Sequence, residues 1–237
     1  MRWIACLALV VATSCVEVVE TGQPQRPTPQ PAVAPRPVPT VTRAHVERFM
    51  TVVQRVEPVA ERTCRERAPR SNCDFRIVVD DRPGQPVNAY QTLDRSGQPI
   101  LAFTLPMIAS VRNADELAFV MGHEAAHHIA GHIPRQQQSA AVGALILGGI
   151  AAATGAGQGV VDQAVNAGAG VGGRVFSKEF ELEADALGAV IAHSAGYDPV
   201  RGVAFFSQIP DPGNRFLGTH PPNAQRVETV RRVAAGL

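Results

Sequence analysis

Residues 121–132 read MGHEAAHHIAGH and hold four of the seven histidines in this 237-residue chain. Within this stretch His123, Glu124 and His127 follow the spacing His-Glu-x-x-His. Residues four apart lie on one face of an α-helix, so His123 and His127 can bind the same Zn²⁺ while Glu124 lies beside its open coordination position. The stretch therefore predicts a metal site on a helix, where metal and carboxylate together make water a nucleophile.

The residues on either side predict where this helix begins and ends. Asn113 can cap its first turn, with Glu116 three residues later to complete a capping box. The apolar residues 117 and 119–121 then predict a buried helix. Pro134 is expected to stop it, because proline disfavours continuation of a helix.

A catalytic zinc usually takes three protein ligands, and the candidates for the third lie in residues 176–188, FSKEFELEADALG. Glu181 and Asp185 are four residues apart and share one helix face, whereas Glu179 and Glu183 share a different one. The first pair would offer one carboxylate to the metal and another to orient an imidazole. The alternative is a solvated acidic face, and spacing alone leaves both open.

Together these motifs resemble the HtpX-like and CAAX-prenyl-protease zinc metallopeptidases, peptidase family M48. The resemblance runs from about residue 46 to 233. The family's HExxHxxxxH motif is matched by His123 to His132, and its ExxAD motif by Glu181 to Asp185. Residues 98–104 and 115–120 resemble the approach to its catalytic helix, and residues 218–222 with Arg226 resemble its THP segment.

The resemblance implies one Zn²⁺ per chain, bound by His123, His127 and Glu181, with Glu124 as the general base. It implies that Asp185 lies behind the ligands, where we expect it to orient an imidazole, preferably that of His123.

The resemblance also places His220 near the reacting carbonyl. Two roles stay open for it, as a hydrogen-bond donor to the oxyanion or as a plug that closes onto the metal. His132 lies about 140° around a regular helix from His127, so we expect it to pack or hydrogen-bond rather than bind the metal. His128 is expected to be structural.

The expected fold class is α+β: a mainly helical, zincin-like (gluzincin) metallopeptidase domain with a small β-sheet beside the active-site helix. Residues 42–67 predict a helix interrupted near Pro58. Residues 75–79, 87–91 and 100–104 predict strands, and the strand ending at Thr104 is our candidate edge for binding extended substrate.

The first residues resemble a secretory signal, with a basic start, an apolar core and small residues before Cys15. We expect residues 1–15 to be a lipoprotein signal with Cys15 lipidated; plain secretion is the alternative. Residues 16–41 would be a proline-rich linker and 42–237 the metallopeptidase domain. The expected location is the periplasm, as a membrane-anchored lipoprotein, preferably of the outer membrane.

Of the four cysteines, Cys6 would leave with the signal and Cys15 would carry the lipid, so Cys64 and Cys73 are the two that remain. In an oxidising compartment this even pair predicts a disulfide. Zinc binding by this pair is the weaker alternative, because no second pair of ligands accompanies it. The net charge of +1 offers no electrostatic basis for binding nucleic acid.

Residues 136–161 contain no charged side chain and include a strongly apolar block. We expect a helical hairpin, buried or lying on a membrane, with a single membrane span as the alternative. Residues 168–173 would then form a flexible glycine-rich connection. The membrane partners considered are therefore the lipid anchor and the apolar segment 139–161.

The sequence thus predicts a zinc endopeptidase acting on proteins or peptides of the bacterial envelope. A different class of function is a zinc-stabilised chaperone or binding module for outer-membrane assembly. Glu124 argues against that class, because a structural site has no need of this carboxylate. An intramembrane protease would need several spans, and only one apolar block follows the signal.

Overall fold

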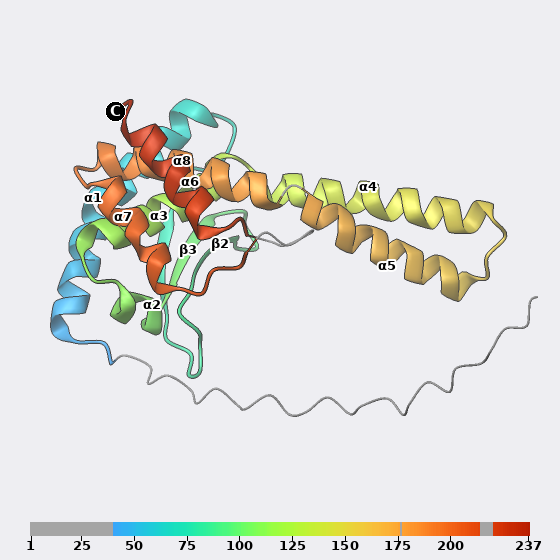
Figure 1. Ribbon diagram of the computed structural model, residues 1–237, viewed down its shortest axis with the longest axis horizontal. Helices are drawn as coiled ribbons and strands as arrows, with labels where there is room; N and C mark the ends of the chain where they lie inside the picture. The colour runs from blue at the N-terminus through green and yellow to red at the C-terminus, as the bar shows by residue number, and fades with distance from the viewer. Residues whose placement is uncertain (1–39, 176, 214–219) are drawn as a thin grey trace, which may run out of the picture. The chain divides into compact units, whose positions relative to one another are not determined.

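The computed structural model describes residues 40–175, 177–213 and 220–237 (Figure 1). The predicted signal, Cys15 and nearly all of the predicted linker lie outside these residues. In chain order the elements are α1 (Arg43–Arg67), β1 (Arg76–Asp80), β2 (Ala89–Leu93), β3 (Pro99–Thr104), α2 (Leu105–Ser110), α3 (Ala114–Ile129), α4 (His132–Ala153), α5 (Gln158–Val175), α6 (Ser177–Ser194), α7 (Pro199–Gly202), the 3-10 helix η1 (Val203–Gln208) and α8 (Asn223–Ala234). Helices with one small sheet confirm the predicted α+β class.

The three predicted strands exist, with ends that lie within two residues of the prediction. They form one sheet in the order β1-β3-β2, with β1 parallel and β2 antiparallel to β3. The prediction that the strand ending at Thr104 offers a free edge is wrong, because β3 is central and pairs on both sides. Four of its six residues, from Leu101 to Thr104, are fully buried, as expected for an inner strand.

The predicted interruption of the first helix near Pro58 is also wrong, because α1 continues through this residue. Proline inside a helix costs about 3 kcal/mol. On the same helix Val52, Val56 and Val59 are buried, and each such burial stabilises by about 1.5–3 kcal/mol. Packing against the core therefore outweighs the local cost of Pro58.

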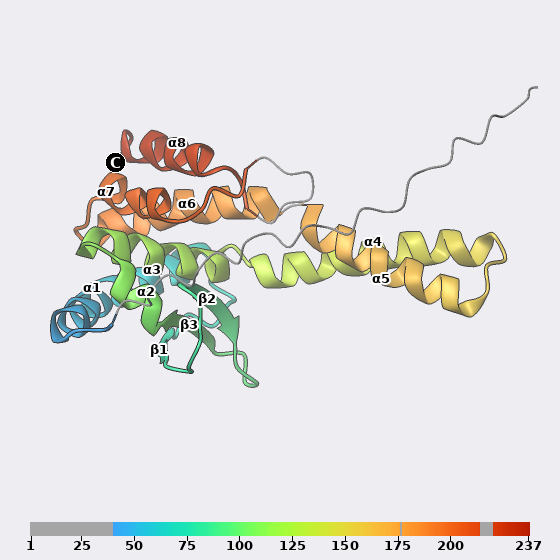
Figure 2. The ribbon, with the colours of Figure 1, turned by 60° about the horizontal axis from the view of Figure 1, so that its bottom comes forward.

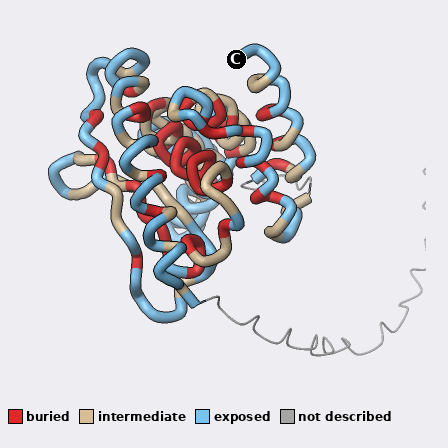
Figure 3. The backbone as a smooth tube through the Cα atoms, turned by 90° about the vertical axis from the view of Figure 1, so that its left-hand side faces the viewer, coloured by how far each residue is buried: buried red, intermediate tan, exposed pale blue. Residues whose placement is uncertain are grey.

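The buried residues gather between α1, β3, α3, α6 and η1 (Figure 3). Helix α3 lies at the centre of this core, and Leu117, Phe119 and Met121 on it are fully buried. Helix α3, which carries the His-Glu-x-x-His motif, is thereby held on several sides by rigid elements.

The two ends of α3 differ in detail from the prediction. Asn113 caps the helix as predicted, accepting a 2.9 Å hydrogen bond from the backbone N–H of Glu116. The Glu116 carboxylate does not close the box on Asn113 but accepts from the N–H of Arg112 at 2.7 Å. At the other end, the break lies at Gly131, whose φ of 64° suits glycine, and Pro134 instead lies in the first turn of α4.

Helices α4 and α5 form the expected hairpin, but it runs from His132 to Val175 and is longer than the predicted segment. Figures 1 and 2 show it extending away from the helices that surround α3. Residues 168–173 are not a flexible connection, because they lie inside α5 and pack against α4. Among the described residues, no helix is sufficiently long and apolar to cross a membrane.

Candidate metal centre and active site

The structure brings three predicted ligands together from two helices. His123 and His127 come from α3 and Glu181 from α6, and one donor atom of each lies within 4.8 Å of the others. The Nε2 atoms of His123 and His127 lie 3.6 and 3.4 Å from the Glu181 carboxylate. The four-residue spacing of the histidines places both rings on the face of α3 toward α6. Two imidazoles and a carboxylate form a donor set that suits zinc.

Two glycines allow α6 to lie close enough to α3 for this meeting. A Cβ atom on Gly122 would lie 2.7 Å from the carbonyl oxygen of Gly188, and one on Gly188 would lie 2.7 Å from the backbone nitrogen of His123. Real Cβ atoms essentially never approach so closely, so any side chain here would push the helices apart. The close crossing decides that Glu181 reaches the histidines.

The second ring nitrogen of His123 faces Asp185, one turn beyond Glu181 on α6. Its Nδ1 lies 2.9 Å from Asp185 Oδ1, and the Asp185 side chain is fully buried. Burial alone would lower the pKa of His123, but the hydrogen bond to Asp185 outweighs it and the pKa is raised. Because Nδ1–H donates to the carboxylate, the lone pair of a neutral His123 lies on Nε2 and points into the site.

A second chain of contacts orients His127. Its Nδ1 lies 2.8 Å from Nδ1 of His132, whose Nε2 lies 3.1 Å from Glu183. Burial lowers the pKa of His132 to about 4, so this ring is neutral near pH 7. The Glu183 carboxylate accepts the Nε2 proton of His132, which leaves Nδ1 of His132 as an acceptor for His127. His127 then carries its own proton on Nδ1 and offers Nε2 to a metal.

The sequence placed Glu183 with Glu179 on a different helix face from Glu181 and Asp185, and spacing gave no sign of its contact with His132. The chain of contacts arises because Gly131 breaks the helix, so that His132 begins α4 instead of continuing around α3. The angle expected from one regular helix therefore does not apply to this pair. His132 is further held by stacking on Phe180, with ring centres 4.6 Å apart.

Glu124 is buried, at 8% exposure, and lines a cavity of about 420 Å³ together with the three ligands. Residues 87–91, including the first half of β2, form one wall of this cavity, and Phe205 and Phe206 form part of another. The general-base candidate, the donor set and a sheet strand thus meet in one cleft.

Arg226 on α8 is a functional candidate to which the sequence gave no role beyond membership in a motif. It donates hydrogen bonds of 2.7 and 2.6 Å to both carboxylate oxygens of Asp185, and it lies 3.3 Å from Glu181. Its guanidinium packs 3.6 Å from the centre of the Phe206 ring. Only the resemblance of residues 218–226 to a family segment pointed to it, because no local spacing connects α8 with α6.

The Glu181 carboxyl lies close to the guanidinium of Arg226 and to the imidazoles of His123 and His127. Burial raises the pKa of Glu181, but the hydrogen bond with His127 and the nearby charges, Arg226 included, bring it well below its usual value. Glu181 is therefore ionised near neutral pH, as a metal ligand must be.

His220 lies at the cavity, with its Nε2 4.0 Å from the Glu181 carboxylate. Its side chain is about half exposed, so it borders both the cleft and solvent. Residues 214–219 of the same segment lie outside the described part of the chain.

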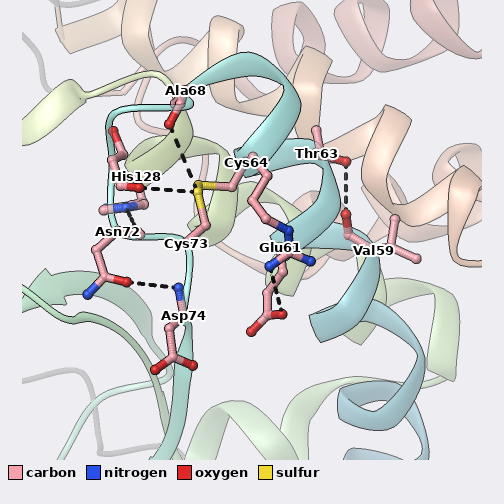
Figure 4. The surroundings of a disulfide bond; sticks show 11 residues. Val59, Glu61, Thr63, Cys64, Ala68, Asn72, Cys73, Asp74 and His128 are labelled. Carbon is pink, nitrogen blue, oxygen red and sulfur yellow. Dashed lines mark hydrogen bonds and ion pairs between the residues drawn. A yellow bond between two sulfur atoms is a disulfide. The ribbon is translucent and has the colours of Figure 1, made fainter.

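Cys64 and Cys73 are joined in a disulfide, with their Cα atoms 5.6 Å apart (Figure 4). The bond connects the end of α1 to the loop that precedes β1. His128 points to this loop, not to the metal centre, and donates a 2.7 Å hydrogen bond to the carbonyl of Asn72 (Figure 4). The disulfide loop is thereby fastened to the active-site helix.

A helix with His-Glu-x-x-His, facing a glutamate from a later helix across a cleft, is the arrangement of a metallopeptidase. The model of peptidase family M48 matches residues 48–234, which is most of the chain. The chain therefore belongs to peptidase family M48 and is a metallopeptidase. The comparison with curated proteins gives no match.

Proposed function

We propose that this metallopeptidase is a zinc-dependent endopeptidase for proteins of the bacterial envelope. The observation that carries the proposal is the meeting of His123, His127 and Glu181 beside a buried Glu124. Two imidazoles and one carboxylate match the donor set of catalytic zinc sites, which leave a position open. Bound there, Zn²⁺ would polarise the scissile carbonyl and lower the pKa of water.

Glu124 accepts the proton of the attacking water and passes it to the leaving amine. His220, at the rim of the cleft, donates a hydrogen bond to the oxyanion that forms during attack. The positive charge of Arg226 keeps Asp185 and Glu181 ionised and fixed in position.

The substrate pairs with β2 rather than with β3. Within the described residues β2 pairs only with β3, so its second edge is unpaired, and its first residues line the cleft. An unpaired strand binds an extended peptide through main-chain hydrogen bonds. Such pairing recognises backbone and not a chain terminus, which favours cleavage within a chain.

We further propose that the enzyme works in the periplasm, tethered through a lipid on Cys15. The disulfide supports an oxidising compartment. The apolar start, the cysteine after small residues and the proline-rich stretch of the sequence support the tether.

The decisive experiment compares casein cleavage by the parent, Glu124→Gln and Glu228→Gln. Glu228 is exposed on α8 and serves as a control for the loss of one carboxylate. Glu124→Gln is expected to lower turnover by about 10²–10⁴-fold while zinc content stays at that of the parent. Cleavage at the parent's rate would refute the role of Glu124, and cleavage that persists after removal of zinc would refute the metal mechanism.

A binding or chaperone module is not favoured by this site. A site that serves only stability is closed by four protein ligands, whereas the described residues supply three here, beside a cleft and a buried carboxylate.

A further inference from the structure

In the α4–α5 hairpin, small residues lie between the two helices and large aliphatic side chains lie on the outside. Helical hairpins of water-soluble proteins have the opposite arrangement, with large apolar side chains buried between the helices. Its two helices touch through Ser139 and Gly143 on α4 and Gly168 and Gly172 on α5. Cβ atoms on these glycines would overlap the backbone of the opposite helix, so the two backbones are in direct contact. Small residues four apart at a close helix crossing are typical of helices packed within lipid.

The large aliphatic side chains of the hairpin face outward instead. Leu145 and Ile150 on α4 are 76% and 57% exposed, and Val160 on α5 is 55% exposed. In water, burying such side chains between the helices would stabilise the hairpin by about 1.5–3 kcal/mol each. Their exposure means that the aliphatic surface is free for another apolar phase or partner.

The composition of this surface favours lipid over protein. Residues 136–173 contain no aromatic residue, methionine, lysine or arginine, and Asp162 is their one charged residue. Protein interfaces are enriched in aromatic residues, methionine and arginine. The exposed large side chains of this segment are valine, leucine and isoleucine, which have the chemistry of acyl chains.

The polar residues of α5 limit how deeply the hairpin can enter a bilayer. Gln158, Asp162 and Asn166 recur every four residues and form a polar stripe, and all three are exposed. Val160 and Val171 lie on the opposite side of the helix. Since no described helix is long and apolar enough to cross a membrane, an orientation parallel to the bilayer surface satisfies both faces.

We propose that the α4–α5 hairpin is a membrane-docking element that lies in the bilayer surface. Its aliphatic face, around Leu145, Ile146 and Ile150, enters the acyl region, while the stripe of Asp162 and Asn166 remains in water. The hairpin carries few charges, so docking requires neither anionic lipid nor low salt.

The position of the hairpin gives this docking a consequence for the site. Helix α4 begins at His132, which contacts His127, and α6, which carries Glu181, starts two residues after α5 ends. Ile133 and Gln136 at the base of the hairpin line the cleft. Docking therefore brings the cleft next to the lipid headgroups, and, resting on the proposed function, favours substrates held at the membrane.

The test is flotation of the chain from residue 15 onward with neutral phosphatidylcholine vesicles. All proteins carry Cys15→Ser, so that neither the apolar signal nor a lipid can bind the vesicles. The double substitution Leu145→Glu/Ile150→Glu places two charges on the aliphatic face, whereas Gln158→Glu/Asn166→Glu places the same two charges in the polar stripe. We expect the first pair to lower the partition coefficient by about tenfold or more and the second to change it less than about threefold.

Two results would overturn the proposal. One is equal vesicle binding by both double variants. The other is a parent chain that self-associates at micromolar concentration without vesicles and is made monomeric by Leu145→Glu/Ile150→Glu, which would assign the face to a second copy of the chain. Circular dichroism melting of each variant excludes unfolding as the cause. Vesicle binding is measured without proteolysis, so this outcome is separate from that of the proposed function.

Discussion

Replacing Arg226 by methionine tests whether a buried ion pair holds the active-site helices together. Arg226 on α8 donates two short hydrogen bonds to Asp185 on α6, and the two side chains are 6% and 0% exposed. Methionine retains an apolar chain that can pack on Phe206 but removes the cation. Among the described residues, Asp185 would then be a buried carboxylate with His123 as its one remaining partner.

The structure gives the expected size of the effect. Removing one partner of a buried pair costs about 3–5 kcal/mol, because the remaining charge has no compensation. With a urea slope of about 2–3 kcal/mol/M for a domain of this size, the unfolding midpoint falls by about 1–2.5 M.

The effect should also depend on pH. Burial raises the pKa of Asp185, but its hydrogen bonds with His123 and Arg226 bring it below the ordinary value. A carboxyl with a lowered pKa contributes stability above the pKa of the unfolded chain, about 3.9, and loses it as pH falls. The difference between Arg226→Met and the parent should therefore shrink below about pH 4.

The assay is urea unfolding of metal-free protein at pH 7.5, followed by circular dichroism. Arg201→Met is the matched control, because Arg201 pairs with Asp115 at 3.2 Å while its own side chain is 65% exposed. An exposed pair contributes about 0–1 kcal/mol. If Arg226→Met loses no more stability than Arg201→Met, the buried pair does not have the role assigned to it.

Four further changes test the site. Glu181→Gln is expected to reduce bound zinc, measured by elemental analysis, whereas the exposed Glu179→Gln should retain it. His132→Ala should weaken zinc binding by about 10–100-fold in chelator competition, and complete loss would make His132 a ligand. His220→Ala should lower kcat on casein by about 10²–10³-fold, whereas a rise would identify an inhibitory plug. Cys64→Ser should lower the free energy of unfolding by about 2–3 kcal/mol in urea, and an unchanged value would contradict the stabilising role of the disulfide.

The sequence predicted best those features that depend on local spacing. Asn113 begins the active-site helix as expected, since a cap needs only the next three residues. The strands also formed close to where alternating apolar residues and turn signals placed them. Pro58 was misjudged because the helix rule describes the local cost and not the burial of the valines around it.

The order of the strands was beyond the reach of local rules. The sheet order β1-β3-β2 makes the third strand central, and this follows from how the strands pair across the chain. The role of residues 168–173 was misread for a related reason. From the sequence alone, a run of glycines predicts a flexible segment. Between α4 and α5, however, glycine is needed because it has no side chain to separate the two helices.

By itself, the sequence determined the catalytic chemistry, because His123, Glu124 and His127 are set on one helix by a fixed repeat of 3.6 residues per turn. Only the tertiary structure decided which groups surround them. The close crossing at Gly122 and Gly188 brings Glu181 to the histidines, the break at Gly131 turns His132 toward His127, and α8 delivers Arg226 to Asp185. These contacts join residues that are far apart along the chain or separated by a bend, and their distances follow from packing, which no local repeat encodes.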